Sequence, residues 1–105
     1  MGVELQTMED FRKRIDDERG RISALDASLD ASRTPYLKWQ LQFAGHLLDD
    51  AENGLRHAAQ GDSSYKPMWL GFAEMNIQQA GQRRQKVQES VDKFGGPDKI
   101  TEYGG

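Results

Sequence analysis

The chain has 105 residues, of which 36% are hydrophobic and 30% charged, and it carries a formal net charge of −3. This length suits one domain, and nine aromatic residues (four Phe, two Trp, three Tyr) are more than full disorder would favour. The lack of cysteine excludes disulfide and thiolate sites, and the interleaved charges give no general attraction to nucleic acid or anionic lipid.

The sequence also lacks the features of a membrane or exported protein. No apolar run is long enough to cross a bilayer, and the first residues lack the apolar core of a signal peptide. We therefore expect a cytoplasmic protein without a membrane segment.

The first helix is predicted over residues 7–31. Thr7 can cap it, and Glu9 and Asp10 fall in the first turn, where the helix dipole favours acidic side chains. Glu18 interrupts the apolar stripe, and we expect it at a solvated or arginine-paired edge. The stripe recurs at spacings of three and four: Met8, Phe11, Ile15, Ile22, Leu25 and Leu29.

The second helix is predicted over residues 35–60. Thr34 is placed as its cap, Pro35 suits the first turn, and Gly61 is a plausible stop. Its apolar stripe is Leu37, Leu41, Ala44, Leu48, Ala51, Leu55 and Ala58.

The third helix is predicted over residues 67–94, from Pro67 to the sequence Gly95-Gly96-Pro97, which cannot continue a helix. Arg84 interrupts its stripe, which comprises Trp69, Ala73, Ile77, Ala80, Val87, Val91 and Phe94. Residues 95–105 offer only Ile100 and Tyr103 as anchors, so we expect a loosely packed tail.

These elements predict an all-α fold. Three long helices with short connections favour antiparallel neighbours, which gives an up-down-up three-helix bundle with coiled-coil-like packing. Residues 1–105 are expected to form this single domain.

The second and third helices each carry a second apolar stripe over their N-terminal halves. Such stripes can fill a wide arc that faces two neighbouring helices, form an interface with another chain, or line a pocket for an apolar ligand. The second stripes are Tyr36, Trp39, Phe43 and Leu47 in one helix, and Met68, Phe72 and Met75 in the other.

Glycines inside the predicted helices suggest close backbone approach, because each costs about 1 kcal/mol relative to alanine there. Such glycines include Gly45, Gly54, Gly71 and Gly81. We expect the closest crossings at the pairs Ala44-Gly45 and Ala80-Gly81.

Two weaker patterns bear on other functions. His46, Asp50 and His57 lie along one line of the second helix, but the two histidines are roughly 16 Å apart along its axis, so a tight metal site would need further ligands. Arg83, Arg84 and the nearby Lys86 form a short basic patch, which is small for a nucleic-acid binder in an acidic chain.

Motifs for catalysis are missing from the sequence: there is no nucleophile elbow and no phosphate-binding glycine loop. We therefore predict a non-enzymatic protein–protein interaction or assembly module without a cofactor, which binds itself as a homo-oligomer or binds another chain. Its expected contact residues are Tyr36, Trp39, Phe43, Met68, Phe72 and Met75. A small-ligand or metal-binding bundle and a nucleic-acid accessory protein remain the alternatives.

Overall fold

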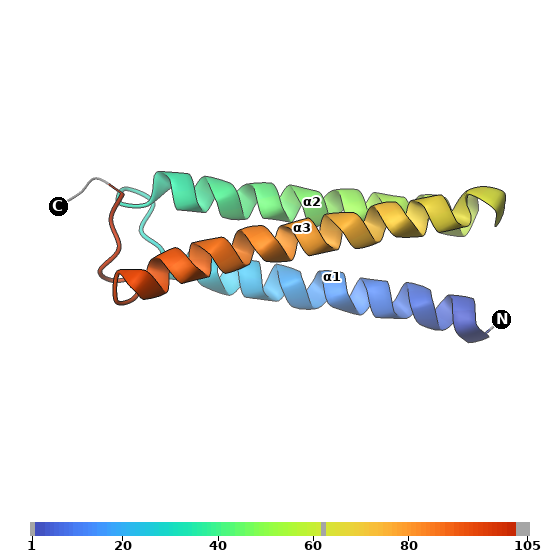
Figure 1. Cartoon of the computed structure of the whole chain (residues 1–105), viewed down its shortest axis with the longest axis horizontal. Helices are drawn as coiled ribbons and strands as arrows, with labels where there is room; N and C mark the ends of the chain where they lie inside the picture. Colours follow the sequence, from blue (N-terminus) through green and yellow to red (C-terminus); the bar gives the residue numbers. More distant parts are fainter. Residues whose placement is uncertain (1, 62, 103–105) are drawn as a thin grey trace.

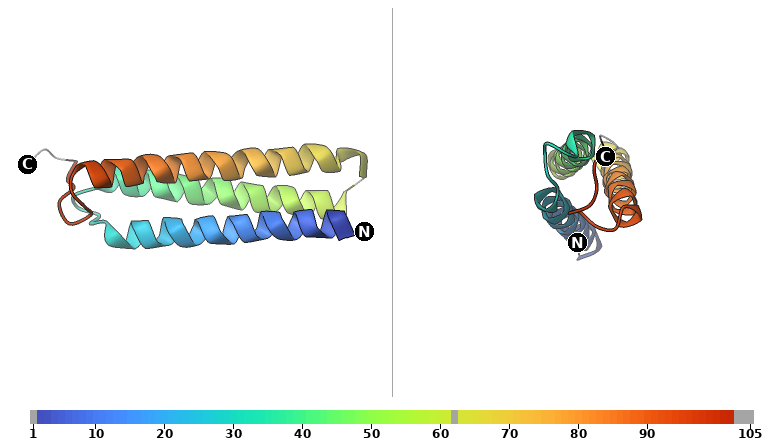
Figure 2. Two further views of the ribbon diagram at one scale, coloured as in Figure 1. Left: turned by 60° about the horizontal axis from the view of Figure 1, so that its bottom comes forward. Right: turned by 90° about the vertical axis from the view of Figure 1, so that its left-hand side faces the viewer.

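The structure is a computed structural model that describes residues 2–61 and 63–102 (Figure 1). Three long helices, α1 (Gly2–Ser28), α2 (Pro35–Gln60) and α3 (Lys66–Lys93), follow one another, and a short 3₁₀ helix, η1 (Ser63–Tyr65), precedes α3. The chain runs up, down and up again, and the end-on view in Figure 2 shows the three helices at the corners of a triangle. The predicted all-α, antiparallel three-helix bundle is thus confirmed.

The molecule is a rod of 55 × 19 × 17 Å, and its core runs along the whole length. The helices α2 and α3 pack against each other more extensively than either packs against α1. Every residue of the predicted α2 stripe is buried, as are most of the α1 and α3 stripes. None of the helices in the described part of the chain has an apolar stretch long enough to cross a lipid bilayer.

The predicted bounds hold for α2 and shift for α1. Helix α1 begins at Gly2, so Thr7 lies inside it and is not its cap. Residues 3–6 contain no helix breaker, which explains the earlier start. The helix ends at Ser28, before the predicted Ala31, because the Asp30 carboxylate accepts hydrogen bonds from the backbone N–H and hydroxyl of Ser32 and forms a turn.

The C-terminal end of α3 lies one residue before the predicted position. The chain turns at Gly95 and Gly96, whose φ angles of 92° and 127° favour glycine. Phe94 therefore leaves the helical stripe, and its side chain is 53% exposed instead of lying in the core.

Residues 95–102, which we expected to pack loosely, contact the start of α2. Ile100 is buried, and the Arg33 guanidinium donates a hydrogen bond to the carbonyl of Asp98 at 2.8 Å. The backbone N–H of Glu102 donates to the carbonyl of Arg33 at 2.9 Å. Tyr103, the other expected anchor, lies outside the described residues.

Among the glycines inside α2 and α3, Gly54 lies closest to the neighbouring helix, whereas Gly45 and Gly81 of the two predicted alanine–glycine pairs do not approach a helix backbone. A Cβ atom on Gly54 would lie 3.0 Å from Phe72 Cδ1 and 3.2 Å from the carbonyl oxygen of Trp69. A Cβ on Gly45 would meet nothing within 4 Å, and one on Gly81 would only approach Glu18. At the predicted pairs it is Ala44 and Ala80 that are buried.

Candidate functional site: an apolar face on α2 and α3

Three aromatic side chains on the first half of α2 form a continuous surface that we call the aromatic patch: Tyr36, Trp39 and Phe43. The Tyr36 and Trp39 rings stack with centroids 6.1 Å apart, and Trp39 and Phe43 follow at 5.8 Å. Phe43 also packs against the core, whereas Tyr36 and Trp39 are 58% and 52% exposed. The patch therefore presents large rings to solvent.

The guanidinium of Arg83 covers one end of the aromatic patch. Its Cζ atom lies 4.2 Å from the Phe43 ring centroid, within cation–π range, and its Nη1 donates a hydrogen bond to Gln40 Oε1 at 2.7 Å. These contacts tie α3 to the outer side of α2.

A second exposed surface, the methionine patch, lies on the first half of α3: Met68, Phe72 and Met75. The two methionines are 57% and 50% exposed, and Phe72 is 37% exposed. The ring of Phe72 lies over Gly54 of α2, which has no side chain to displace it. Phe72 also meets Trp69 edge to face, with centroids 6.0 Å apart.

Both patches lie on one side of the molecule, at opposite ends. Because α2 and α3 are antiparallel, the contacts Phe43–Arg83, Gly54–Phe72 and His57–Trp69 define a single register between them. The aromatic patch therefore lies level with the last half of α3, and the methionine patch lies level with the last half of α2.

Helix α1 covers the other side of this helix pair. On α2, Glu52 and Asp49 pair with Arg19 of α1, and on α3, Glu74 pairs with Arg14 of α1. Tyr36, Phe43 and Gly54 project about 160° away from Glu52 on the α2 helix, at 100° per residue. The surface of α2 and α3 that carries both patches, which we call the α2/α3 face, thus lies on the side away from α1.

All six predicted contact residues lie on this face. Five of them are exposed, and Phe43 is half-buried. Leu47, which continues the second stripe of α2, is buried and belongs to the core. The wide-arc interpretation therefore holds for Leu47 and for part of Phe43, and does not account for the exposed rings and methionines.

The three candidate metal ligands do not come together. His46, Asp50 and His57 are all exposed, and the His57 ring stacks on Trp69 with centroids 4.4 Å apart. Nowhere in the described part of the chain do three His, Cys, Asp or Glu side chains group closely enough to hold a metal ion.

The three basic residues considered for nucleic-acid binding do not share one set of contacts. Arg83 contacts α2, as described above, whereas Arg84 is largely buried and pairs with Glu18 of α1. Lys86 is exposed. Since two of the three cations are held in separate intramolecular contacts, they do not form one surface for phosphate groups.

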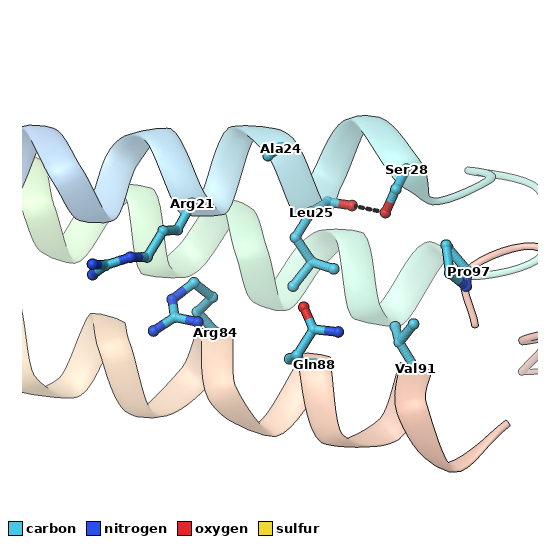
Figure 3. A pocket seen from close by; sticks show the side chains of 8 residues that line it. All are labelled: Arg21, Ala24, Leu25, Ser28, Arg84, Gln88, Val91 and Pro97. Carbon is cyan, nitrogen blue, oxygen red and sulfur yellow. Dashed lines mark hydrogen bonds between the residues drawn. The ribbon is translucent and has the colours of Figure 1, made fainter. Parts of the chain in front are cut away.

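Arg84, which pairs with Glu18, lines a groove of about 370 Å³ between α1 and α3 (Figure 3). Arg21 and Arg84 lie at one end of this groove, Leu25 and Val91 line it further along, and Pro97 of the tail lies at the other end. Glu18 is only 6% exposed and accepts hydrogen bonds from both arginines. The expectation that it lies at an edge was wrong as to burial, although the arginine pairing was right.

Comparison of the chain with protein-family models, with curated protein sequences and with solved structures finds no match.

Proposed function

We propose that this protein is a non-enzymatic interaction module that assembles with a protein chain through the α2/α3 face. The observation that carries the proposal is that large apolar side chains are gathered in two exposed patches on one side of a bundle that already has a filled core. Single exposed apolar residues are ordinary on monomers, but contiguous apolar surfaces usually mark binding sites.

The chemistry of the patches supports a protein partner. Aromatic rings, methionine and arginine are the residue types enriched at the centre of protein interfaces, and all three occur here. The Tyr36 and Trp39 rings stack on each other, and the Phe72 ring packs over Gly54, so these side chains are ordered before binding. This order reduces the side-chain entropy that is lost on association. Exposed Lys and Glu side chains, by contrast, would lose more rotamer entropy when a partner orders them.

The rival functions have less support. The acidic net charge and the separate contacts of Arg83 and Arg84 speak against nucleic-acid binding, and the dispersed histidines speak against a metal site. The cytoplasmic location is part of the same proposal and stays a prediction.

A photo-activated cross-linking amino acid at position 39 tests the interaction function. We expect it to cross-link the protein to a second chain, either another copy or a different protein, in extracts of the source cells. The same amino acid in place of Ser23, which is exposed on α1, is the matched control and should give no such product.

Charged substitutions give the complementary test. Trp39→Glu and Phe72→Glu should abolish the position-specific association while the circular dichroism of the helices stays that of the wild type, because both side chains are partly exposed. The cross-linking amino acid is also placed at position 72. If it cross-links no other chain from either position 39 or position 72, the interaction function is refuted. If either substitution unfolds the isolated protein, that residue belongs to the core.

A further inference from the structure

We propose that the α2/α3 face is covered by a second copy of this chain, antiparallel to the first, so that the aromatic patch of each copy meets the methionine patch of the other. This inference rests on the proposed interaction function and names its partner. Three observations on the face support it: the spacing of the two patches, the position of two opposite charges, and the place of their midpoint within the bundle.

The first observation is the spacing of the patches. Counting along the antiparallel helices from the Gly54–Phe72 contact places Met75 level with Ala51 and Met68 level with Ala58. The aromatic patch is centred near Trp39, roughly 22 Å away along α2 at 1.5 Å per residue. A twofold axis midway between the patches, near Leu47 of α2, therefore places each patch at the same level along the rod as the other patch of the partner copy.

The second observation is a pair of opposite charges at matching distances from that axis. Arg83 lies level with Phe43, four residues before Leu47, and Asp50 lies three residues after it. Asp50 is exposed and has no ion-pair partner among the described residues. The axis derived from the apolar patches therefore also brings Arg83 of each copy near Asp50 of the other, once on either side.

The third observation is that this axis coincides with the middle of α2, which spans Pro35–Gln60. Two antiparallel copies would therefore overlap along their whole length, and neither patch would be left uncovered. The contact is also chemically suitable, because methionine sulfur packs favourably against aromatic rings. An interface of this kind is self-complementary, as a closed twofold dimer requires.

Charge exchange across the axis tests the arrangement. In sedimentation or light-scattering titrations, Arg83→Glu and Asp50→Arg should each weaken dimerisation by about tenfold or more, because each places like charges opposite one another. The double variant R83E/D50R should restore most of the wild-type affinity, since it exchanges the charges. Ser23→Glu on α1 is the control and should leave the affinity unchanged.

A single cysteine tests the position of the axis, because the natural chain has no cysteine. Gln79 lies level with Leu47 on the same face, so Gln79→Cys should give a disulfide-linked dimer on mild oxidation, whereas Ser23→Cys should not. Circular dichroism and melting temperature of each variant show whether the helices remain folded.

Three outcomes would overturn this inference. A wild-type protein that stays monomeric at all accessible concentrations excludes the second copy, and cross-linking of a different protein at position 39 would then leave the interaction function standing. A dimer in which R83E/D50R is as weak as the single variants has another geometry. A dimer that Gln79→Cys fails to link has its axis elsewhere.

Discussion

Glu18 and Arg84 are charged residues at positions where the helical pattern predicts apolar ones, and they form an ion pair with each other. Each residue interrupts the apolar stripe of its own helix, and the two side chains meet between α1 and α3. Arg21 adds a second hydrogen bond to the carboxylate at 3.2 Å. Glu18 is thereby supplied with partners for a charge that would otherwise be costly to bury.

Removing one member of this pair should destabilise the bundle more than removing both. We expect Glu18→Leu and Arg84→Leu each to lower the free energy of unfolding by about 2 to 4 kcal/mol, because the first leaves Arg84 without its partner and the second leaves Glu18 with only the exposed Arg21. The double variant E18L/R84L should recover most of that loss, since leucine fits the apolar stripes on both sides.

Urea denaturation of the four proteins, with circular dichroism as the signal, measures this coupling. Concentrations below the onset of association keep dimerisation out of the comparison. Losses that simply add in the double variant would show that the two side chains do not interact.

At this scale the sequence predicted which residues are buried better than it predicted their partners. Every residue of the predicted α2 stripe is buried, because the period of a helix determines which side chains share a face, although the stripe left out Leu47, which is buried as well. The partner of Glu18 could not be found in this way, since Arg84 lies 66 residues away and on a different helix. Gly54 was one of the glycines that suggested a close approach, but the sequence could not single it out, because the contact depends on the register between α2 and α3.

Among the elements, α2 is the one whose ends the chain defines most sharply. Pro35 begins it, and the backbone N–H of Gly61 donates to the carbonyl of His57 at its end. Thr34 does not act as the predicted cap, because its hydroxyl donates to the carbonyl of Asp30 at 2.8 Å. Glu102 caps the start of α2 instead: its carboxylate accepts hydrogen bonds from the backbone N–H of Tyr36 at 2.9 Å and of Leu37 at 3.1 Å.

Glu102→Ala should therefore lower the free energy of unfolding by about 1 kcal/mol, the usual effect of losing an N-terminal cap with a favourable charge. Glu102→Gln should cost less, because the amide oxygen can still accept one hydrogen bond. Hydrogen exchange of the Tyr36 and Leu37 amides should accelerate in the alanine variant. Unchanged exchange at both amides would contradict the capping role.

The cap also explains why the tail could not be predicted. A carboxylate that stabilises α2 lies 66 residues beyond the amide it accepts from, so no local spacing indicates it. Apolar residues alone suggested a weakly anchored tail, whereas polar contacts of Arg33, Asp98 and Glu102 hold residues 98–102.

For the whole molecule, the attachment of α1 differs from the attachment of α2 to α3. The apolar stripe of α1 is flanked by ion pairs on both sides: Arg14 pairs with Glu74 of α3, and Arg19 pairs with Glu52 of α2. The hydrogen bond from Arg19, together with the charges of Arg19 and Arg56, lowers the pKa of the Glu52 carboxyl below its usual range. Folding therefore favours the ionised form of Glu52.

The direction of the pH effect follows. A carboxyl whose pKa is lower in the folded than in the unfolded protein stabilises the fold above its unfolded value, near 4.5, and loses this contribution as the pH falls through the folded value. The free energy of unfolding should drop as the pH falls below about 5, and Glu52→Gln should remove about 0.5 to 1 kcal/mol of that drop, because the pair is partly exposed.

Urea titrations at a series of pH values, with and without added salt, measure this dependence. Salt should reduce the difference between the wild type and Glu52→Gln at neutral pH, since it screens exposed charges. Identical pH profiles for the two proteins would show that the Arg19–Glu52 contact contributes nothing to stability.

The three passes that α1, α2 and α3 make along the rod have a consequence for how the molecule could be labelled. Because the chain crosses its length three times, residues 2 and 102 lie at opposite ends of a rod 55 Å long (Figure 1). Fluorophores at these two ends of one chain would lie far apart, so energy transfer between them would be weaker than between fluorophores that lie side by side. In an antiparallel pair, by contrast, the donor end of one chain would lie beside the acceptor end of the other, so mixing singly labelled chains would convert association into a light signal.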